Sequence, residues 1–189
     1  SVLATSPTIA TVANASSAAG TYPITVTGGS AANYQLSYQN GTLAVGKGAQ
    51  VIHFVSELNA TYGQAALTLE GNATSGLSLG YSSSNPSVAE VNGSKLLILG
   101  SGTSVITAYQ GGNANFDAAP DRNATLQVGK ATLTVKANDA SKAYLAAVPS
   151  LSYELLGFVN DENASVLATS PTIATVANAS SAAGTYPIT

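Results

Sequence analysis

An identical internal repeat constrains the fold of this chain more than any other feature of its sequence. Residues 1–25 read SVLATSPTIATVANASSAAGTYPIT, residues 165–189 read the same, and the second copy begins 164 residues after the first. That period is too long for a solenoid unit of about 20–50 residues, and it suits one or two globular domains. We therefore expect a tandem array, of which this chain holds one full period and the start of the next. A segment duplicated by design would leave the same pattern.

The composition favours short strands joined by tight turns. Ser and Thr supply 43 residues, Gly 18 and Asn 14, and all four weaken helix interiors. Val, Ile, Thr and Tyr recur in short runs, as strands prefer. The chain has no Cys, so each module must be held by core packing alone, which about 80 residues can just achieve.

Charge and hydropathy narrow the set of partners. Only 8% of the residues are charged, the net charge is −3 and the six basic residues are scattered, which argues against nucleic acid as a partner. No apolar run approaches the roughly 18 residues that cross a bilayer, so we expect no membrane span in this fragment. Signals for export and anchoring, if the protein has them, are expected outside it.

Two similar junctions divide the period into two modules. Val45-Gly46-Lys47 and Val128-Gly129-Lys130 each follow a strand-like stretch and precede a new apolar run. We predict that residues 1–47 are the C-terminal part of one module, including the repeat overlap, and that residues 48–130 are a complete module. Residues 131–189 are then the N-terminal part of the next module, within which 165–189 repeats 1–25.

Short apolar or alternating runs predict the strands of both modules. In the complete module they are 51–55, 66–70, 78–82, 88–91, 95–99, 104–109 and 124–128. Seven short strands separated by turn signals indicate an Ig-like sandwich. In the divided module the candidates are 22–26, 34–38, 42–45, 132–136, 151–155 and 172–176. Asn92-Gly93 and Asn40-Gly41 predict hairpin turns. The predicted fold class is all-β, with tandem Ig-like antiparallel β-sandwich modules, two per repeat.

The complete module resembles the bacterial Ig-like repeats of prokaryotic surface proteins. The residues that carry this resemblance are Tyr62-Gly63, the run YSSSNPSVA from Tyr81 to Ala89, Gly100 to Thr103, and Gly112 to Phe116. The resemblance implies a place in long cell-surface or secreted proteins built of many modules.

The divided module resembles the MBG family of surface repeats. The carriers are Leu133 to Val135, Lys142 to Tyr144, Leu151 to Tyr153, Gly184 to Ile188 and Asn33-Tyr34. The chain departs from the family pattern at Tyr144-Leu145, where Tyr-Gly is usual, and this raises the question of that turn's geometry. The resemblance implies the same surface proteins and brings no catalytic residues with it.

No pattern in the sequence points to an enzyme. His53, the one histidine, alternates within VIHFV and is expected to face a sheet surface. A lone His without Cys or clustered partners is a poor metal or catalytic site, so we predict no catalytic, metal-binding or cofactor-binding residue. Asp117 with Asp121, and Asp161 with Glu162, are expected in solvated turns. Ca²⁺ at module junctions is the one weak alternative, because it needs six to eight oxygen ligands.

The Asn-x-Ser/Thr sequons are the most informative local motif. Eight of the 14 asparagines qualify, whereas the Ser and Thr content would give about three by chance. We predict N-glycosylation, because glycans would hydrate a surface that carries almost no charge; Ser/Thr-rich turns producing sequons without use is the alternative. The candidates are Asn14, Asn40, Asn59, Asn72, Asn92, Asn123, Asn163 and Asn178.

Together these features predict a non-enzymatic structural repeat of a long extracellular protein, which forms a rod, sheath or filament at the cell surface. The expected partners are neighbouring copies of the same repeat, joined head to tail. The junction is either a covalent array or strand complementation, in which residues 131–189 of one molecule complete residues 1–47 of the next. An adhesin module that binds glycans or a host or cell-wall partner is the alternative, and it predicts exposed tyrosines gathered on one sheet face.

Overall fold

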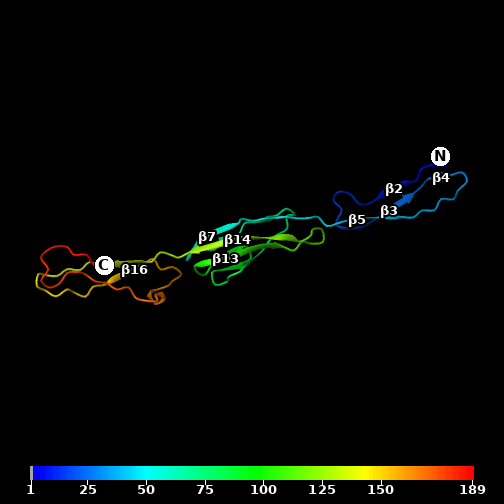
Figure 1. Ribbon diagram of the computed structural model, residues 1–189. Helices are drawn as coiled ribbons and strands as arrows, with labels where there is room; N and C mark the ends of the chain where they lie inside the picture. The colour runs from blue at the N-terminus through cyan, green and yellow to red at the C-terminus, as the bar shows by residue number, and fades with distance from the viewer. Residues whose placement is uncertain (1) are drawn as a thin grey trace. The chain divides into compact units, whose positions relative to one another are not determined.

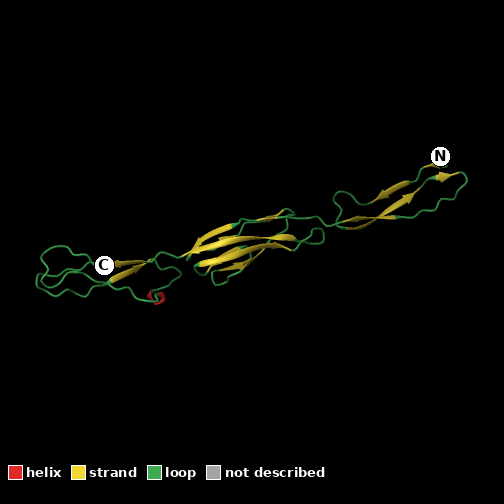
Figure 2. Ribbon diagram, in the orientation of Figure 1, coloured by secondary structure: helices red, strands yellow, loops and turns green. Residues whose placement is uncertain are grey.

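The computed structural model describes residues 2–189 and confirms the all-β prediction (Figure 2). The described residues form sixteen strands in several mainly antiparallel sheets, and one single-turn 3₁₀ helix, η1, at Ala164–Val166. None of the helical structure in this range has the length and apolar character needed to cross a membrane. The Ig-like detail of the predicted sandwiches, and the module boundaries at 47/48 and 130/131, stay predictions.

The chain divides into two compact units, each made of several segments. The first contains the described residues up to Ser56, with Thr68–Ser84 and Val105–Ala124, and the second contains Glu57–Leu67, Asn85–Ser104 and Thr125–Thr189. Strands β13 (Gly102–Gln110) and β14 (Ala119–Gly129) run through both units.

The first unit contains the first copy of the repeated sequence. There β3 (Gly20–Thr27) is the middle strand of a three-stranded antiparallel sheet, between β2 (Thr8–Thr11) and β5 (Gly41–Val45). The short strands β1 (Leu3–Thr5) and β4 (Ser30–Ala31) pair beside it (Figure 1).

The remaining strands of the first unit surround a small core. They are β6 (Ile52–His53), which pairs with β9 (Asn72–Ala73), and β10 (Gly80–Ser83), which pairs with β13. Ile52, Ala108 and Ala119 are buried together, with Phe54, Leu79 and Tyr81 packed against them. The Phe54 and Tyr81 rings lie 5.4 Å apart, tilted by 50°, and burial raises the pKa of the Tyr81 hydroxyl.

The second unit contains the other buried strands and the second copy of the repeat. Strand β7 (Glu57–Thr61) pairs in parallel with β14, and β11 (Ala89–Asn92) forms a hairpin with β12 (Lys95–Ile98). Beyond β14, β15 (Thr134–Ala137) pairs with β16 (Tyr153–Leu156). Strand β8 (Leu67–Thr68), at the unit boundary, joins β12 in a three-stranded sheet, and the four-stranded sheet has the order β10-β13-β14-β7.

Alternation explains which residues are buried. Along β13 from Ser104 and along β14 from Ala124, every second residue faces inward, so Ser104, Ile106 and Ala108, and then Ala124, Leu126 and Val128, are buried while the residues between them are exposed or half-buried. This is the period of two expected of a strand with one buried face. All buried residues of the described chain lie between Gln50 and Val128; residues 2–47 and 131–189 contain none.

The strand and hairpin predictions were correct in most places, and two strands and one hairpin were wrong. The hairpin at Asn92-Gly93 is confirmed: Asn92 pairs with Lys95, and Gly93 has the left-handed φ of +62° that such turns need. Strands at 34–38 and 172–176, and a hairpin at Asn40-Gly41, are wrong. Residues 34–40 lie outside any strand, and of 172–176 only Thr175 forms a bridge, with Ile188.

Side-chain hydrogen bonds explain why residues 34–40 do not form a ladder. The Tyr38 hydroxyl donates to the Gly28 carbonyl at 2.6 Å, and the Asn40 side-chain oxygen accepts from the Val26 amide at 3.3 Å. Polar side chains therefore tie this segment to the end of β3, in competition with backbone pairing.

Candidate functional site

His53 lies on β6, opposite Asn72 of β9, and its side chain is exposed. It lines a shallow groove with Phe54, Glu70 and Gly71 among others. Within residues 2–189 no group of three or more His, Cys, Asp and Glu side chains is placed to hold a metal ion. The Glu70 carboxylate is one further titratable side chain that lines this groove.

The two acidic pairs lie in different settings, and the turn expected at Asp121 is wrong, because this residue lies within β14. At Asp117 it is the backbone that acts: its amide donates to the Gly48 carbonyl at 3.0 Å, and its carbonyl accepts from the Gln50 side-chain amide at 2.6 Å. Asp161 has a φ of +58° in a tight turn, and the neighbouring Glu162 carboxylate accepts a hydrogen bond of 2.7 Å from the Tyr62 hydroxyl. The Glu162 carboxylate of the second pair therefore accepts a hydrogen bond from within the chain.

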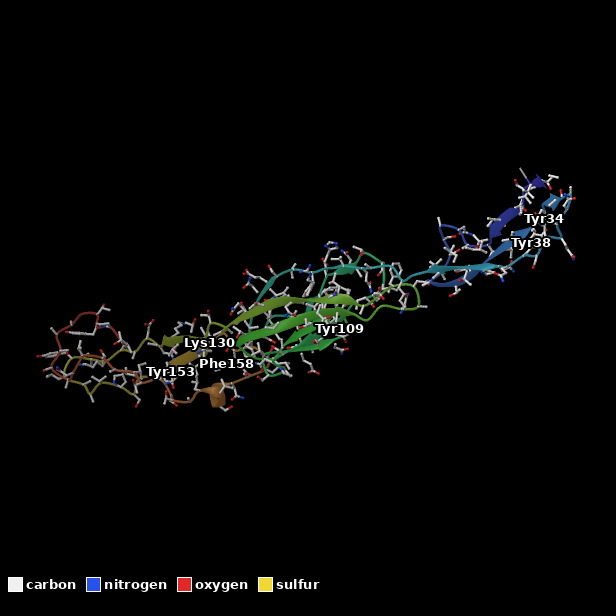
Figure 3. All side chains as sticks on the ribbon, turned by 45° about the vertical axis from the view of Figure 1, so that its right-hand side comes forward. Tyr34, Tyr38, Tyr109, Lys130, Tyr153 and Phe158 are labelled. Atoms are coloured by element: carbon white, nitrogen blue, oxygen red, sulfur yellow. The ribbon has the colours of Figure 1, made fainter. Side chains whose placement is uncertain are left out.

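The Tyr62 contact belongs to a packed joint within the second unit. Gly63 has a φ of +84°, and a Cβ added there would lie 2.5 Å from Cβ of Val159. A pocket beside this contact is lined by Tyr62, Leu99, Lys130, Leu133, Phe158 and Val159 among others. Lys130 and Phe158 are labelled in Figure 3. These residues come from both sides of the boundary predicted at 130/131. The packing identifies this pocket as a joint between segments of the second unit.

All eight sequon asparagines have exposed side chains. They occur in turns, at strand ends and on exposed faces of strands, so no single element presents them. Asn14, Asn163 and Asn178 begin turns or cap η1, Asn40 precedes β5, and Asn72 and Asn92 are end residues of β9 and β11, while Asn59 lies within β7 and Asn123 within β14. The side-chain nitrogen is the atom that a glycan would modify.

Several of these asparagines already have a defined side-chain orientation. The Asn14 side-chain oxygen accepts from the amide and hydroxyl of Ser16 at 2.9 and 2.7 Å, and Asn178 makes the same bonds with Ser180 at 3.0 and 2.8 Å. Asn163 accepts from the Ser165 amide at 3.0 Å. In each case the residue that completes the sequon binds the asparagine oxygen, and not the nitrogen to which a glycan would be attached.

Four tyrosines are largely exposed: Tyr34, Tyr38, Tyr109 and Tyr144. Tyr109 lies on β13, where its ring covers Gly80 of the neighbouring strand, whereas Tyr34 and Tyr38 lie on the irregular segment before β5 (Figure 3). Of the four, only Tyr109 lies on a strand, so the exposed tyrosines do not gather on one sheet face.

A cavity of about 710 Å³ lies among residues of the second unit. Its walls come from residues 137–151, which begin at the last residue of β15, and from the second copy of the repeat, including Thr175 and Gly184 to Ile188. Polar contacts link the two walls: the Leu145 amide and the Lys142 ammonium donate to the Ala179 carbonyl at 3.0 and 3.2 Å. Neither the sequon pattern nor the strand pattern predicted this cavity.

Comparison with known proteins gives a family match and, among solved structures, a weak similarity to a surface layer protein. Residues 2–44 and 133–189 match the MBG domain of the YGX type. The chain is also similar to the structure of domains 1–6 of the surface layer protein SbsC, with 14% sequence identity and a TM-score of 0.29 over 90% of this chain. It spans 25% of that chain, and a likeness at this level bears on no functional question. No curated protein matches.

The family match confirms one of the two resemblances seen in the sequence. Its two ranges lie inside residues 1–47 and 131–189, where an MBG-type module was expected. Residues 49–128, with their resemblance to bacterial Ig-like repeats, lie outside the match, so the alternation of two module types stays a prediction. Because the match extends over more than half of its residues, the chain belongs to the MBG domain family of the YGX type.

Proposed function

We propose that this chain is a structural repeat of a long extracellular surface protein. The observation that carries the proposal is the 25-residue identity at a spacing of 164 residues within an MBG-family chain. An array of such units gains stability mainly from contacts between neighbours, so its length extends without new chemistry. The groups described above include none arranged for catalysis, and we assign the chain no enzymatic role.

Surface exposure is tested on intact cells of the source organism. External protease, added without lysis, is expected to release fragments of this sequence, while a cytoplasmic marker protein stays intact. Fragments that appear only after lysis would overturn the proposal.

We further propose that the sequons carry N-linked glycans. Their support is the exposure of all eight asparagines and the low charge of the surface, which glycans would hydrate. The intact mass of the natural protein is expected to fall on glycan removal. Asn92→Gln and Ser94→Ala should each remove the same glycan mass, whereas Asn33→Gln, at an exposed asparagine outside a sequon, should remove none. An intact mass equal to that of the bare sequence would contradict the idea.

Glycan binding by an adhesin module is the second candidate function. The exposed rings of Tyr34 and Tyr38 support it, because aromatic faces stack on sugars. Tyr34→Ala is expected to weaken any binding seen on a glycan array, with Tyr144→Ala as the matched exposed control. An array without hits would dismiss this function and leave the structural one standing.

A further inference from the structure

The two copies of the repeated sequence provide an internal comparison, because the same residues appear in two different surroundings. In the first copy, β3 has a partner on each side. Its half from Ile24 to Thr27 pairs with β2, and its half from Gly20 to Ile24 pairs with β5.

The second copy keeps the β2 side of this arrangement. Thr175 pairs with Ile188, which is the equivalent of Thr11 with Ile24. The Ala174 and Thr189 amides and carbonyls exchange two hydrogen bonds of 2.8 and 2.9 Å, in the position of the Ala10 and Thr25 pair. The register is therefore the same in both copies.

The β5 side differs. Residues 184–187, equivalent to Gly20 through Pro23, lie outside any strand or bridge of the described chain. They line the 710 Å³ cavity together with Ile188. A volume of this size is within the range of about 300–1,000 Å³ that ligand sites occupy. Among the described residues no strand pairs with Gly184 to Pro187, although the Pro187 carbonyl accepts a hydrogen bond from the Thr175 hydroxyl at 2.8 Å.

We propose that Gly184–Ile188 is a docking edge for a strand with the sequence of Gly41–Val45, supplied by a second copy of the repeat. The register follows from β3 and β5: Gly184 pairs with Val45, Thr185 with Ala44, Tyr186 with Leu43, Pro187 with Thr42 and Ile188 with Gly41. This inference rests on the proposed function, since it names the contact by which one repeat engages the next.

Burial supplies an independent reason for the contact. Neither residues 2–47 nor residues 131–189 contain a buried side chain, although both ranges match one family. Leu43 of β5 is 38% exposed. A second copy seated on the edge adds a backbone ladder and brings apolar side chains over the cavity walls, and both changes favour association.

The test measures binding of a synthetic peptide with the sequence of residues 26–47 to the 189-residue chain. Saturable one-to-one binding is expected by calorimetry. In NMR spectra, shifts are expected at Thr185 and Tyr186 but not at Thr21 and Tyr22, whose own β5 is in place. A peptide of scrambled sequence should not bind. No binding, or equal shifts at both copies, would overturn the docking edge.

Two variants distinguish strand addition from nonspecific association. The Leu43→Pro peptide loses the backbone amide opposite Tyr186, which faces the docking edge in this register, and should bind at least about tenfold more weakly, a loss of roughly 1.4 kcal/mol. A chain extended after Thr189 by the sequence of residues 26–47 should not bind the peptide, because its edge is filled. Undiminished binding in either case would contradict the inference. The surface-repeat proposal would survive such a result, since it is tested separately on cells.

Discussion

At the residue scale, Leu145 shows how this chain departs from its family. The family pattern has Tyr-Gly where this chain has Tyr144-Leu145, so the turn must form without its usual glycine. The structure places Leu145 at a φ of +66°, in the left-handed region that glycine normally occupies. In the complete module, Gly63 of the Tyr62-Gly63 pair has a φ of +84° at the corresponding position. The turn is thus preserved, at the expense of backbone strain in a residue with a side chain.

Leu145→Gly is expected to stabilise the chain. Relief of the left-handed strain outweighs the extra entropy that glycine gains in the unfolded state, for a net of about 1 kcal/mol. The measurement is the free energy of unfolding in urea. Ala146→Gly, at the neighbouring position without positive φ, should lower that free energy by about 0.4–1 kcal/mol. The same sign in both variants would contradict this explanation.

Gly63 and Gly93 separate backbone strain from steric exclusion. Both have positive φ, but a Cβ at Gly93 meets nothing within 4 Å, whereas at Gly63 it lies 2.5 Å from Val159. Gly93→Ala should therefore cost only the strain of about 1–2 kcal/mol, and Gly63→Ala should cost at least about 1 kcal/mol more, in line with other overpacking changes. Thermal unfolding of both variants checks the difference, and equal losses would refute a tight joint at Val159.

At the element scale, identical segments take different secondary structure. Residues 20–24 are strand in β3, and residues 184–188 are not, apart from the single bridge at Ile188. Intrinsic propensity is the same in both places, so the difference arises from the neighbour. The backbone amides and carbonyls of a segment form a strand only where a second segment hydrogen-bonds to them.

Hydrogen exchange measured by NMR should reveal the difference in backbone pairing between the two copies. No correction of the intrinsic exchange rates is needed, because the two segments have the same sequence. The ladder amides of residues 20–24 are expected to exchange more slowly than their equivalents in 184–188, because only the former pair with β5. Intrinsic exchange rates are equal for identical sequences, so each amide has its own control. Adding the peptide of residues 26–47 should slow the second set. Equal protection in the absence of peptide would show that β5 contributes no ladder.

At the scale of the whole molecule, buried residues are confined to one part of the chain. Among the described residues they begin at Gln50 and end at Val128, and the segments that match the MBG family contain none. Burial of apolar area is the dominant stabilising term in folding, so the MBG segments as they stand here are the least stabilised. Joining the two halves of the MBG-type module should bury apolar side chains that are exposed in each half alone.

A chain that joins residues 131–189 to residues 26–47 is expected to fold as a stand-alone module. It contains β15, β16, the second repeat copy and the sequence of β4 and β5, so both walls of the cavity and its proposed cover are present. We expect a single cooperative urea transition, and a shallow or absent one for residues 131–189 alone, because the slope of unfolding scales with the surface buried. Identical transitions in the two chains would contradict the predicted division of modules.

Sequence patterns located the long-range organisation better than the individual strands. The repeat, the MBG resemblance and the all-β class follow from identity, motif and composition. The alternation along 104–109 and 124–128 correctly predicted buried strands, since a period of two is typical of a strand with one buried face. The pattern at 34–38 alternates as well, yet Tyr38 and Asn40 bind the end of β3 through their side chains. A pattern of alternating apolar residues does not reveal such competition between side-chain hydrogen bonds and strand pairing.

The repeated 25 residues separate what the sequence determined from what the tertiary structure decided. Both copies form the same local bonds: the Asn14 and Asn178 turns, and the Tyr22 and Tyr186 hydroxyls, which donate to carbonyls four residues earlier at 2.8 and 3.0 Å. These partners lie within a few residues, so the sequence brings them along wherever it occurs. Strand identity differs between the copies, because residues 20–24 pair with Gly41–Val45 while no strand of the described residues lies beside 184–187, and such a ladder is made by tertiary pairing and not by the local sequence.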